Sequence, residues 1–261
     1  MKKNPLEKVM KLILKFFSRQ LLIKISLFLR PFLRILYKGT KYTDPIDGSS
    51  YRSFLPYGYN SPRQNALCPG TLSLERHRLL WLYLKKKTKL LEKKISVLHV
   101  APEMVFIKKF KKITNWNYVS VDLNSPLADL KANIYNLPFK ENYFDLILCN
   151  HVLEHIEDDY KALNELYRVI KNKGILIAQI PIDKNLKKTF ENKEIINRRD
   201  RNKYFGQYDH VRIYGLDFYK RLSNSGFKPK KIDILKKISK QEKMKYCLPK
   251  DEEIPVGIAI K

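Results

Sequence analysis

Short apolar runs alternate with helical patterns through the second half of the chain. The runs cover residues 96–100, 118–121, 144–149, 174–181, 231–235 and 256–260. Apolar runs of this length, bounded by polar residues, are typical of buried strands. Strands that alternate with helices predict a mainly parallel sheet with both faces covered.

The N-terminal segment has a different period. Its apolar residues recur at three- and four-residue steps with lysines on the other face, which predicts an amphipathic helix. Charges interrupt the segment too often for a membrane span, which needs roughly 20 mainly apolar residues, and no secretory cleavage site follows. Residues 1–41 are therefore either an anchor on an anionic membrane surface or a helical hairpin packed on its own domain. The apolar positions are Leu6, Val9, Met10, Ile13, Phe16 and Phe17.

Residues 42–75 form a loop-rich segment of Gly, Pro, Ser and Tyr. Two quartets in it, DPID at 44–47 and CPGT at 68–71, resemble the paired turns of a zinc knuckle. Only one of the four thiolates of such a site is present, so we assign no metal to it. Aromatic packing is the expected source of its stability. The four positions that cysteines would occupy in a zinc knuckle are Asp44, Asp47, Cys68 and Thr71. The aromatic residues are Tyr51, Phe54, Tyr57 and Tyr59.

Charge and cysteine content narrow the partners and the compartment. The 261 residues include 52 Lys and Arg against 26 Asp and Glu, a net charge of +26. The electrostatic field of such a positive charge favours phosphates, anionic lipid or acidic glycans as partners. Three scattered cysteines are too few for a disulfide framework, which indicates a reducing, cytoplasmic compartment.

The candidate chemistry lies just after the predicted strands, where open α/β sheets bind their ligands. The strand that begins near residue 96 leads into a turn without glycine, and the whole stretch between Leu72 and Lys173 contains none. Asp122 ends the next strand and is placed to accept hydrogen bonds from a ribose diol. The polar residues that follow the strands are His99, Glu103, Asp122, Asn133, Asn150 and His151.

One stretch carries a resemblance to a known family. Residues 137–174 contain an L-P-F turn, an F-D-L strand start, an L-E-H turn and a Lys-Gly turn in succession. In this order and spacing they resemble a class I S-adenosylmethionine-dependent methyltransferase of the type 11-like group. The resemblance implies a Rossmann-like, seven-stranded α/β sheet with an antiparallel last strand, formed by residues 76–261. The implied cofactor is S-adenosylmethionine.

The resemblance also implies roles for individual residues. Asp122 with Leu123 would hold the ribose, Asn133 with Ile134 the adenine, and Asn150 with His151 the methionine moiety.

The first loop departs from the glycine-rich pattern of the family and reads H-x-A-P-E, like an uncharacterised bacterial branch with paired knuckle cysteines. Two explanations stay open. Glu103 replaces a backbone contact to the cofactor, or the pocket is lost and the protein is an inactive scaffold at a membrane. The loop residues are His99, Ala101, Pro102 and Glu103.

Residues 182–214 form an insert on the acceptor side of the predicted domain. Within it His210 is the first candidate to accept a proton from the methyl acceptor, and His151 is the second. Asp209, His210 and Arg212 are equally consistent with an ion-paired clasp that holds the insert. The expected acceptor is a small molecule, a glycan or a lipid-linked compound. An RNA acceptor is an alternative on charge alone, but no RNA-binding module occurs.

Overall fold

The computed structural model describes residues 19–58 and 62–261, which divide into two compact units. One unit combines residues up to 83 with 236–251, and the other combines 84–235 with 252–261. Sequence analysis placed residues 236–251 with the sheet domain, and the structure places them in the N-terminal unit. The helix expected at residues 6–17 lies outside the described residues. Within the described part, no helix is both long and apolar enough to cross a membrane.

The larger unit is built on a seven-stranded sheet of order β12-β13-β9-β8-β5-β6-β7. The five strands from β9 to β7 pair in parallel, and β13 runs antiparallel to both of its neighbours. This is the Rossmann-like, seven-stranded sheet with an antiparallel last strand that the family resemblance implied. The strands are β5 (Ile95–Val100), β6 (Trp116–Asp122), β7 (Leu130–Lys131), β8 (Phe144–Cys149), β9 (Ile170–Ile177), β12 (Phe227–Ile232) and β13 (Ile254–Ala259).

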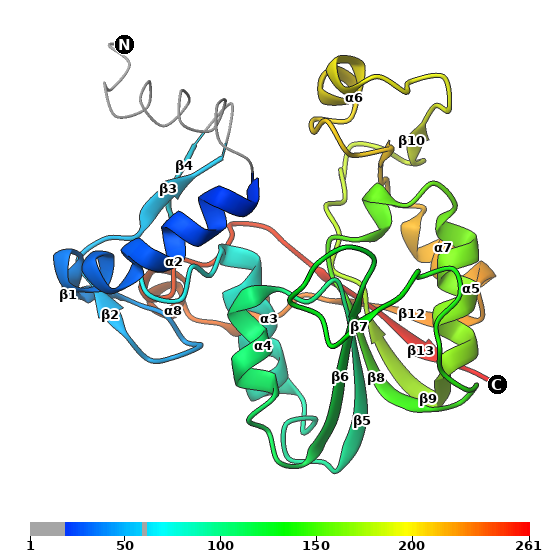
Figure 1. The fold of residues 1–261 in the computed structure, drawn as a ribbon, viewed down its shortest axis with the longest axis horizontal. Coiled ribbons are helices and arrows are strands. Elements are labelled where there is room, and N and C mark those ends of the chain that lie inside the picture. Colours follow the sequence, from blue (N-terminus) through cyan, green and yellow to red (C-terminus); the bar gives the residue numbers. More distant parts are fainter. Residues whose placement is uncertain (1–18, 59–61) are drawn as a thin grey trace. The chain divides into compact units, whose positions relative to one another are not determined.

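Helices cover both faces of the sheet (Figure 1). On one side α4 (Met104–Phe110) buries Phe106 and Phe110, whose rings stack at 4.8 Å. On the other side α5 (Asp159–Val169) and α7 (Phe218–Asn224) pack a continuous core against the strands. The remaining elements of this unit are η1 (Leu153–His155), β10 (Phe190–Glu191), α6 (Arg198–Tyr204), β11 (Arg212–Ile213) and η2 (Leu235–Lys237), of which η2 continues past the end of the unit at residue 235.

Two strands begin four residues before their predicted starts, at 170 instead of 174 and at 227 instead of 231. The prediction began one strand at Gly174, but β9 begins at Ile170, where it pairs with Phe144. The prediction of 231–235 was also shifted, because β12 runs over Phe227–Ile232 and has only one fully buried residue, Phe227. Its lysines face solvent at the edge of the sheet, so the apolar pattern there is weak.

The N-terminal unit has a polar centre where the sequence resembled a zinc knuckle. The Asp44 carboxylate accepts hydrogen bonds from the Thr71 hydroxyl and, at 2.6 Å, from Ser73 Oγ. Cys68 is fully buried, and burial followed by the charge of Asp44 raises its pKa to about 12. Of the aromatic residues expected to hold the unit, Tyr51 and Phe54 pack against Cys68. The elements are α2 (Arg19–Leu36), β1 (Lys38–Thr43), β2 (Ser50–Tyr51), β3 (Leu55–Tyr57), β4 (Arg63–Leu67), α3 (Glu75–Lys87, which continues past the end of the unit at residue 83) and α8 (Lys240–Lys245).

One buried arginine explains why residues 236–251 belong to this unit. The Arg78 guanidinium is fully buried and donates to the carbonyls of Tyr246 and Cys247 at 2.7 Å each. It also donates to Ser73 and Ala66 in the knuckle region. A buried guanidinium needs this many acceptors because it cannot lose its charge. Arg78 therefore joins two segments about 170 positions apart in the chain.

Candidate functional site

The carboxyl ends of three central strands lie in register at one edge of the sheet. Val100 at the end of β5 pairs with Val121 of β6 on one side and with Cys149 of β8 on the other. The next residue of each strand or loop is Ala101, Asp122 and Asn150. The register therefore places three of the predicted site residues side by side at this edge.

The loop after β5 turns without glycine. Ala101 adopts a left-handed conformation with φ 48° and donates its N–H to Val121 O at 2.8 Å. Glycine adopts this conformation most easily. Alanine occupies the position here, at some cost in backbone strain. Pro102 is buried, and Glu103 begins α4.

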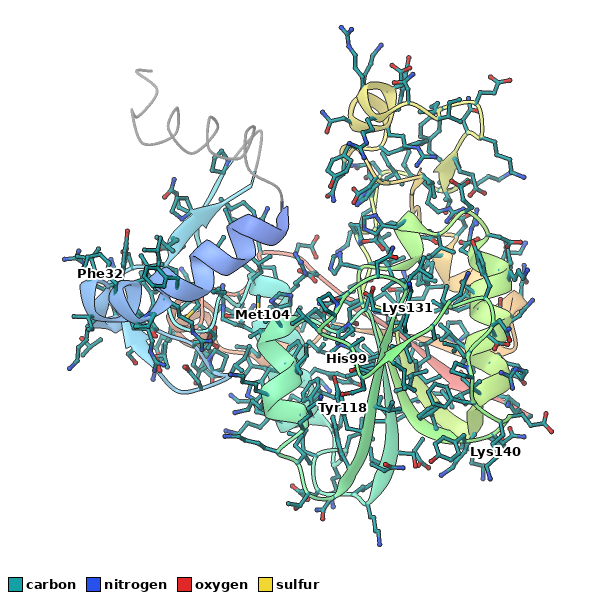
Figure 2. The ribbon with its side chains drawn as sticks, viewed as in Figure 1. Phe32, His99, Met104, Tyr118, Lys131 and Lys140 are labelled. Atoms are coloured by element: carbon teal, nitrogen blue, oxygen red, sulfur yellow. The ribbon has the colours of Figure 1, made fainter. Side chains whose placement is uncertain are left out.

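His99 of β5, labelled in Figure 2, holds Glu103 in place. His99 is fully buried, with Nε2 2.5 Å from Glu103 Oε2 and Nδ1 2.9 Å from the Tyr118 hydroxyl. Burial raises the pKa of Tyr118, which therefore stays a hydroxyl. Both ring nitrogens of His99 are thus engaged inside the protein, and the Glu103 side chain, 15% exposed, is the group that reaches the surface of the loop.

Asp122 is held by its own turn. Its Oδ1 accepts the N–H groups of Asn124 at 2.7 Å and Ser125 at 2.6 Å. These bonds orient the carboxylate. Leu123 beside it is 52% exposed.

Asn133 follows β7 and is exposed, whereas its neighbour Ile134 is buried in the core. The Asn133 side-chain oxygen accepts the N–H of Tyr135 at 3.0 Å. The residue is therefore positioned by a tight turn next to the end of β6, where Ala132 N–H bonds to Asp122 O.

The turn after β8 carries the densest group of functional side chains. His151 has φ 51°, and its N–H donates to Gln179 O at 2.7 Å. Its Nδ1 lies 3.0 Å from Glu154 Oε1. Burial acts to raise the pKa of Glu154, but the hydrogen bond and charge of His151 outweigh it, so the pKa is lowered and the group is a carboxylate. His151 Nδ1 therefore donates to this carboxylate, and His151 Nε2 is buried without a hydrogen-bond partner in the described chain, as is the amide nitrogen of Asn150.

The insert places His210 against this turn. The rings of His155 and His210 meet edge to face at 4.7 Å, and Val211 N–H donates to Glu154 O at 2.9 Å. Burial lowers the pKa of His210, so its imidazole is neutral at neutral pH. His210 also lines a pocket of about 270 Å³ with Pro181, Ile182, Asp183, Phe205, Arg212 and Ile213.

Arg212 forms the clasp that the sequence suggested, but with other partners. Its Nε donates to Glu191 Oε2 at 2.8 Å, and its Nη groups donate to the carbonyls of Leu153 and Glu157 at 3.0 Å. Asp209, the partner considered from sequence, instead lies 3.5 Å from His155 Nδ1. Arg212 thereby fixes the insert to the L-E-H turn.

The family of the larger unit follows from this sheet together with a sequence match. Residues 83–178 match the profile described as Methyltransferase domain, the Methyltransf_11 family. They cover the strands β5 to β9 and the site residues at their carboxyl ends. The chain contains a class I methyltransferase domain. S-adenosylmethionine is the cofactor of this domain.

Individual relatives match the methyltransferase domain over short stretches. An uncharacterized protein of Methanocaldococcus jannaschii is 59% identical over 49 residues, which are 19% of this chain and 21% of that protein. A ubiquinone/menaquinone biosynthesis C-methyltransferase of Vibrio cholerae is 41% identical over 49 residues, 19% of each chain. The chain thus spans about a fifth of the length of these relatives.

Solved structures resemble the methyltransferase domain at low identity. The YcgJ protein of Bacillus subtilis has a TM-score of 0.43 and 16% identity, covering 71% of this chain and 99% of its own. A 1,6-didemethyltoxoflavin-N1-methyltransferase of Burkholderia thailandensis, solved with bound 1,6-didemethyltoxoflavin and S-adenosylhomocysteine, has a TM-score of 0.44 and 13% identity, covering 66% of this chain and 73% of its own. Likenesses at this level carry no argument about activity.

The residues at the carboxyl edge fit the cofactor. S-adenosylmethionine presents a ribose diol, a sulfonium, an ammonium and a carboxylate. Asp122 offers an oriented carboxylate, and Asn150 offers an amide donor that has no partner in the described chain. Glu103 and Glu154 add negative charge near the end of β8. Burial is the main cause of the raised pKa of the Cys149 thiol, and the charges of Glu154 and Glu103 raise that pKa further. The glycine-rich first loop that is typical of the family is absent from this edge.

Sequence reasoning missed two members of the site. Glu154 belongs to the L-E-H motif and was interpreted only as part of a turn, although a carboxylate three residues after a histidine is a usable signal. Tyr118 gave no signal, because its position in a predicted strand does not reveal that its hydroxyl meets His99.

Proposed function

We propose that the protein is an S-adenosylmethionine-dependent methyltransferase that acts on a small-molecule, glycan or lipid-linked acceptor. The observation that carries the proposal is the row of Ala101, Asp122 and Asn150 at one edge of the sheet, with an oriented carboxylate and an unpartnered amide in it. A scaffold that had lost its cofactor would have no reason to keep a buried donor without a partner.

The proposal gives each residue a task. Asp122 accepts the hydroxyls of the ribose, and Asn133 approaches the adenine from the next turn, beside the buried Ile134. Glu103, held by His99, meets the positive charge of the sulfonium or ammonium where the family uses bare backbone. S-adenosylmethionine supplies an electrophilic methyl group when it is bound.

The acceptor side is assigned to the pocket beside His210. Its lining of apolar side chains with a few polar ones, and its volume of about 270 Å³, suit a small molecule or the head group of a larger one. His210 and His151 are the groups to which the proposal assigns the proton of an acceptor hydroxyl. His151 is supported by its geometry, because Glu154 orients the ring through Nδ1 and Nε2 has no hydrogen-bond partner in the described chain.

We further propose that the enzyme works at an anionic membrane surface. On α2, Phe28, Phe32 and Ile35 recur at helical spacing and are 83%, 62% and 76% exposed. Arg30 and Arg34 lie among them. Apolar side chains flanked by basic ones are typical of helices that lie in the interface of anionic bilayers.

Cofactor binding tests the main proposal. The full-length protein is titrated calorimetrically with S-adenosylmethionine and S-adenosylhomocysteine. Asp122→Ala should weaken both by at least about tenfold, since hydrogen bonds to a charged group contribute about 1.5–3 kcal/mol. The matched control is Asp145→Asn. Asp145 lies near the amino end of β8, away from the site, and its side chain bonds to Ser96 N and Lys171. No binding of either ligand at millimolar concentration would overturn the proposal and leave the inactive scaffold.

A further inference from the structure

Two histidines and one carboxylate converge beside the acceptor pocket. Glu154, His155 and His210 each offer one ligand atom, and these atoms all lie within 4.8 Å of one another. The three residues come from two segments, the turn η1 after β8 and the insert. The backbone bond from Val211 N–H to Glu154 O, at 2.9 Å, fixes the two segments together.

The carboxylate of this cluster is buried and incompletely bonded. The Glu154 side chain is 2% exposed, and its Oε1 is engaged by His151. Its Oε2 is buried and has no hydrogen-bond partner in the described chain. A buried carboxylate oxygen without a donor is costly unless a cation satisfies it.

The histidine next to it has the orientation of a metal ligand. His155 Nδ1 lies 3.1 Å from the carbonyl oxygen of Asp209, which can only accept, so Nδ1 carries the hydrogen. The lone pair is then on Nε2. A ligating histidine commonly donates its other N–H to a backbone carbonyl in this way, which fixes the tautomer and the ring orientation.

We propose that Glu154, His155 and His210 bind a divalent transition-metal ion at the edge of the acceptor pocket. Two imidazoles and one carboxylate form a donor set that suits zinc and its neighbours, and three protein ligands leave a coordination position open. His210 belongs both to the cluster and to the pocket lining, so the open position is next to the pocket.

The metal site is inferred from this geometry alone. Only the role of the bound ion rests on the proposed function. That task is to hold an oxygen of the acceptor, such as a hydroxyl or a carboxylate. With the ion bound, His210 is a ligand, and His151, whose Nε2 has no hydrogen-bond partner in the described chain, is left as the candidate to accept the proton of the acceptor.

Direct titration tests the site. The full-length protein is freed of metal with a chelator and titrated calorimetrically with Zn²⁺. One equivalent should bind, and His155→Gln, His210→Gln and Glu154→Gln should each weaken it by more than about tenfold, because loss of an outer partner alone costs about 10–100-fold. The matched control is Glu157→Gln, three residues from Glu154, whose side chain is 72% exposed and pairs with Arg201.

Several outcomes would overturn the site. They are no stoichiometric Zn²⁺ binding, binding that all three variants retain, or binding that Cys247→Ser abolishes, which would place the ion at the thiols near Cys68. His155→Gln and His210→Gln change partly exposed side chains, so they remain informative if Glu154→Gln does not fold. S-adenosylhomocysteine binding is measured on the same samples. Zn²⁺ binding without cofactor binding would refute the proposed function and keep the metal site, and the reverse would refute only the metal site.

Discussion

A single carboxylate holds the L-P-F turn in place. Glu165 Oε1 accepts the N–H of Leu137 at 2.7 Å, and both of its oxygens accept from the Arg168 guanidinium. Arg168 donates in turn to the carbonyls of Leu137 and Phe139. The hydrogen bond from Arg168 is the main reason that the pKa of Glu165 is lowered below its ordinary value of 4.5. Charge as well as proline therefore fixes this turn.

The lowered pKa of Glu165 predicts a contribution to acid sensitivity. A carboxyl whose pKa is lower in the folded than in the unfolded state adds stability above the unfolded value and loses it as the pH falls through the folded value. From about pH 6 to about pH 3, the wild type should therefore lose more free energy of unfolding than Glu165→Gln. Urea unfolding at several pH values measures this. The exposed Glu194→Gln should follow the wild type, and parallel curves for all three proteins would contradict the prediction.

Charged side chains join elements on the face of the sheet that α5 and α7 cover. Arg221 of α7 donates to both oxygens of Asp159 at the start of α5, at 2.9 and 3.0 Å, and to Glu191 of β10 at 2.7 Å. The Tyr214 hydroxyl completes the group through Asp159 Oδ2. Asp159 is 2% and Arg221 8% exposed, so water screens this network weakly. The network ties the insert to the two helices that cover this face.

Removal of Arg221 should destabilise the methyltransferase domain strongly. Arg221→Met leaves Asp159 buried without its main partner, and such a loss costs about 3–5 kcal/mol. Urea unfolding followed by circular dichroism measures the change. Lys171→Met, which breaks the half-exposed pair with Asp145, is the control and should cost less than about 1 kcal/mol. Equal losses in the free energy of unfolding for the two substitutions would show that the buried network contributes no more to stability than the half-exposed pair does.

For the whole molecule, net charge and one exposed helix face point to the same partner. The chain carries +26, and residues 1–41 contain eleven Lys and Arg against one acid, Glu7. Phe28 and Phe32 stand on the exposed part of α2, where Figure 2 labels Phe32. Under the membrane proposal, charge would attract the protein to an anionic surface over a distance of about 8 Å at physiological salt, and the aromatic side chains would bind it there.

Vesicle binding is therefore expected to depend on both features. The protein should bind phosphatidylserine-containing vesicles, bind neutral vesicles much less, and lose affinity as salt is raised. Phe28→Ser with Phe32→Ser should weaken binding by about tenfold or more, since burial of each side chain contributes about 1.5–3 kcal/mol. Tyr57→Ser, an aromatic residue 39% exposed elsewhere in the same unit, is the control. Cosedimentation measures the affinities, and equal binding to neutral vesicles would contradict the proposal.

The sequence by itself determined the sheet and the row of residues at its edge. Alternating apolar runs and helical patterns report burial, which is a local property of each segment, so six of the strands and the mainly parallel arrangement were predictable, whereas the short β7 was not. Asp122 and Asn150 follow strands that a parallel sheet must align, so their proximity followed as well. Strand ends were less predictable where burial is partial, as in β12, with its single fully buried residue.

Only the tertiary structure decided the contacts between distant segments. Arg78 reaches carbonyls about 170 positions away, and no local pattern marks which carbonyls a buried guanidinium will find. The approach of His210 to Glu154 and His155 likewise depends on how the insert folds back, which Arg212 fixes through carbonyl groups that every residue has. Side-chain types report what chemistry a chain can perform, but the backbone path through the insert determines which of these groups meet.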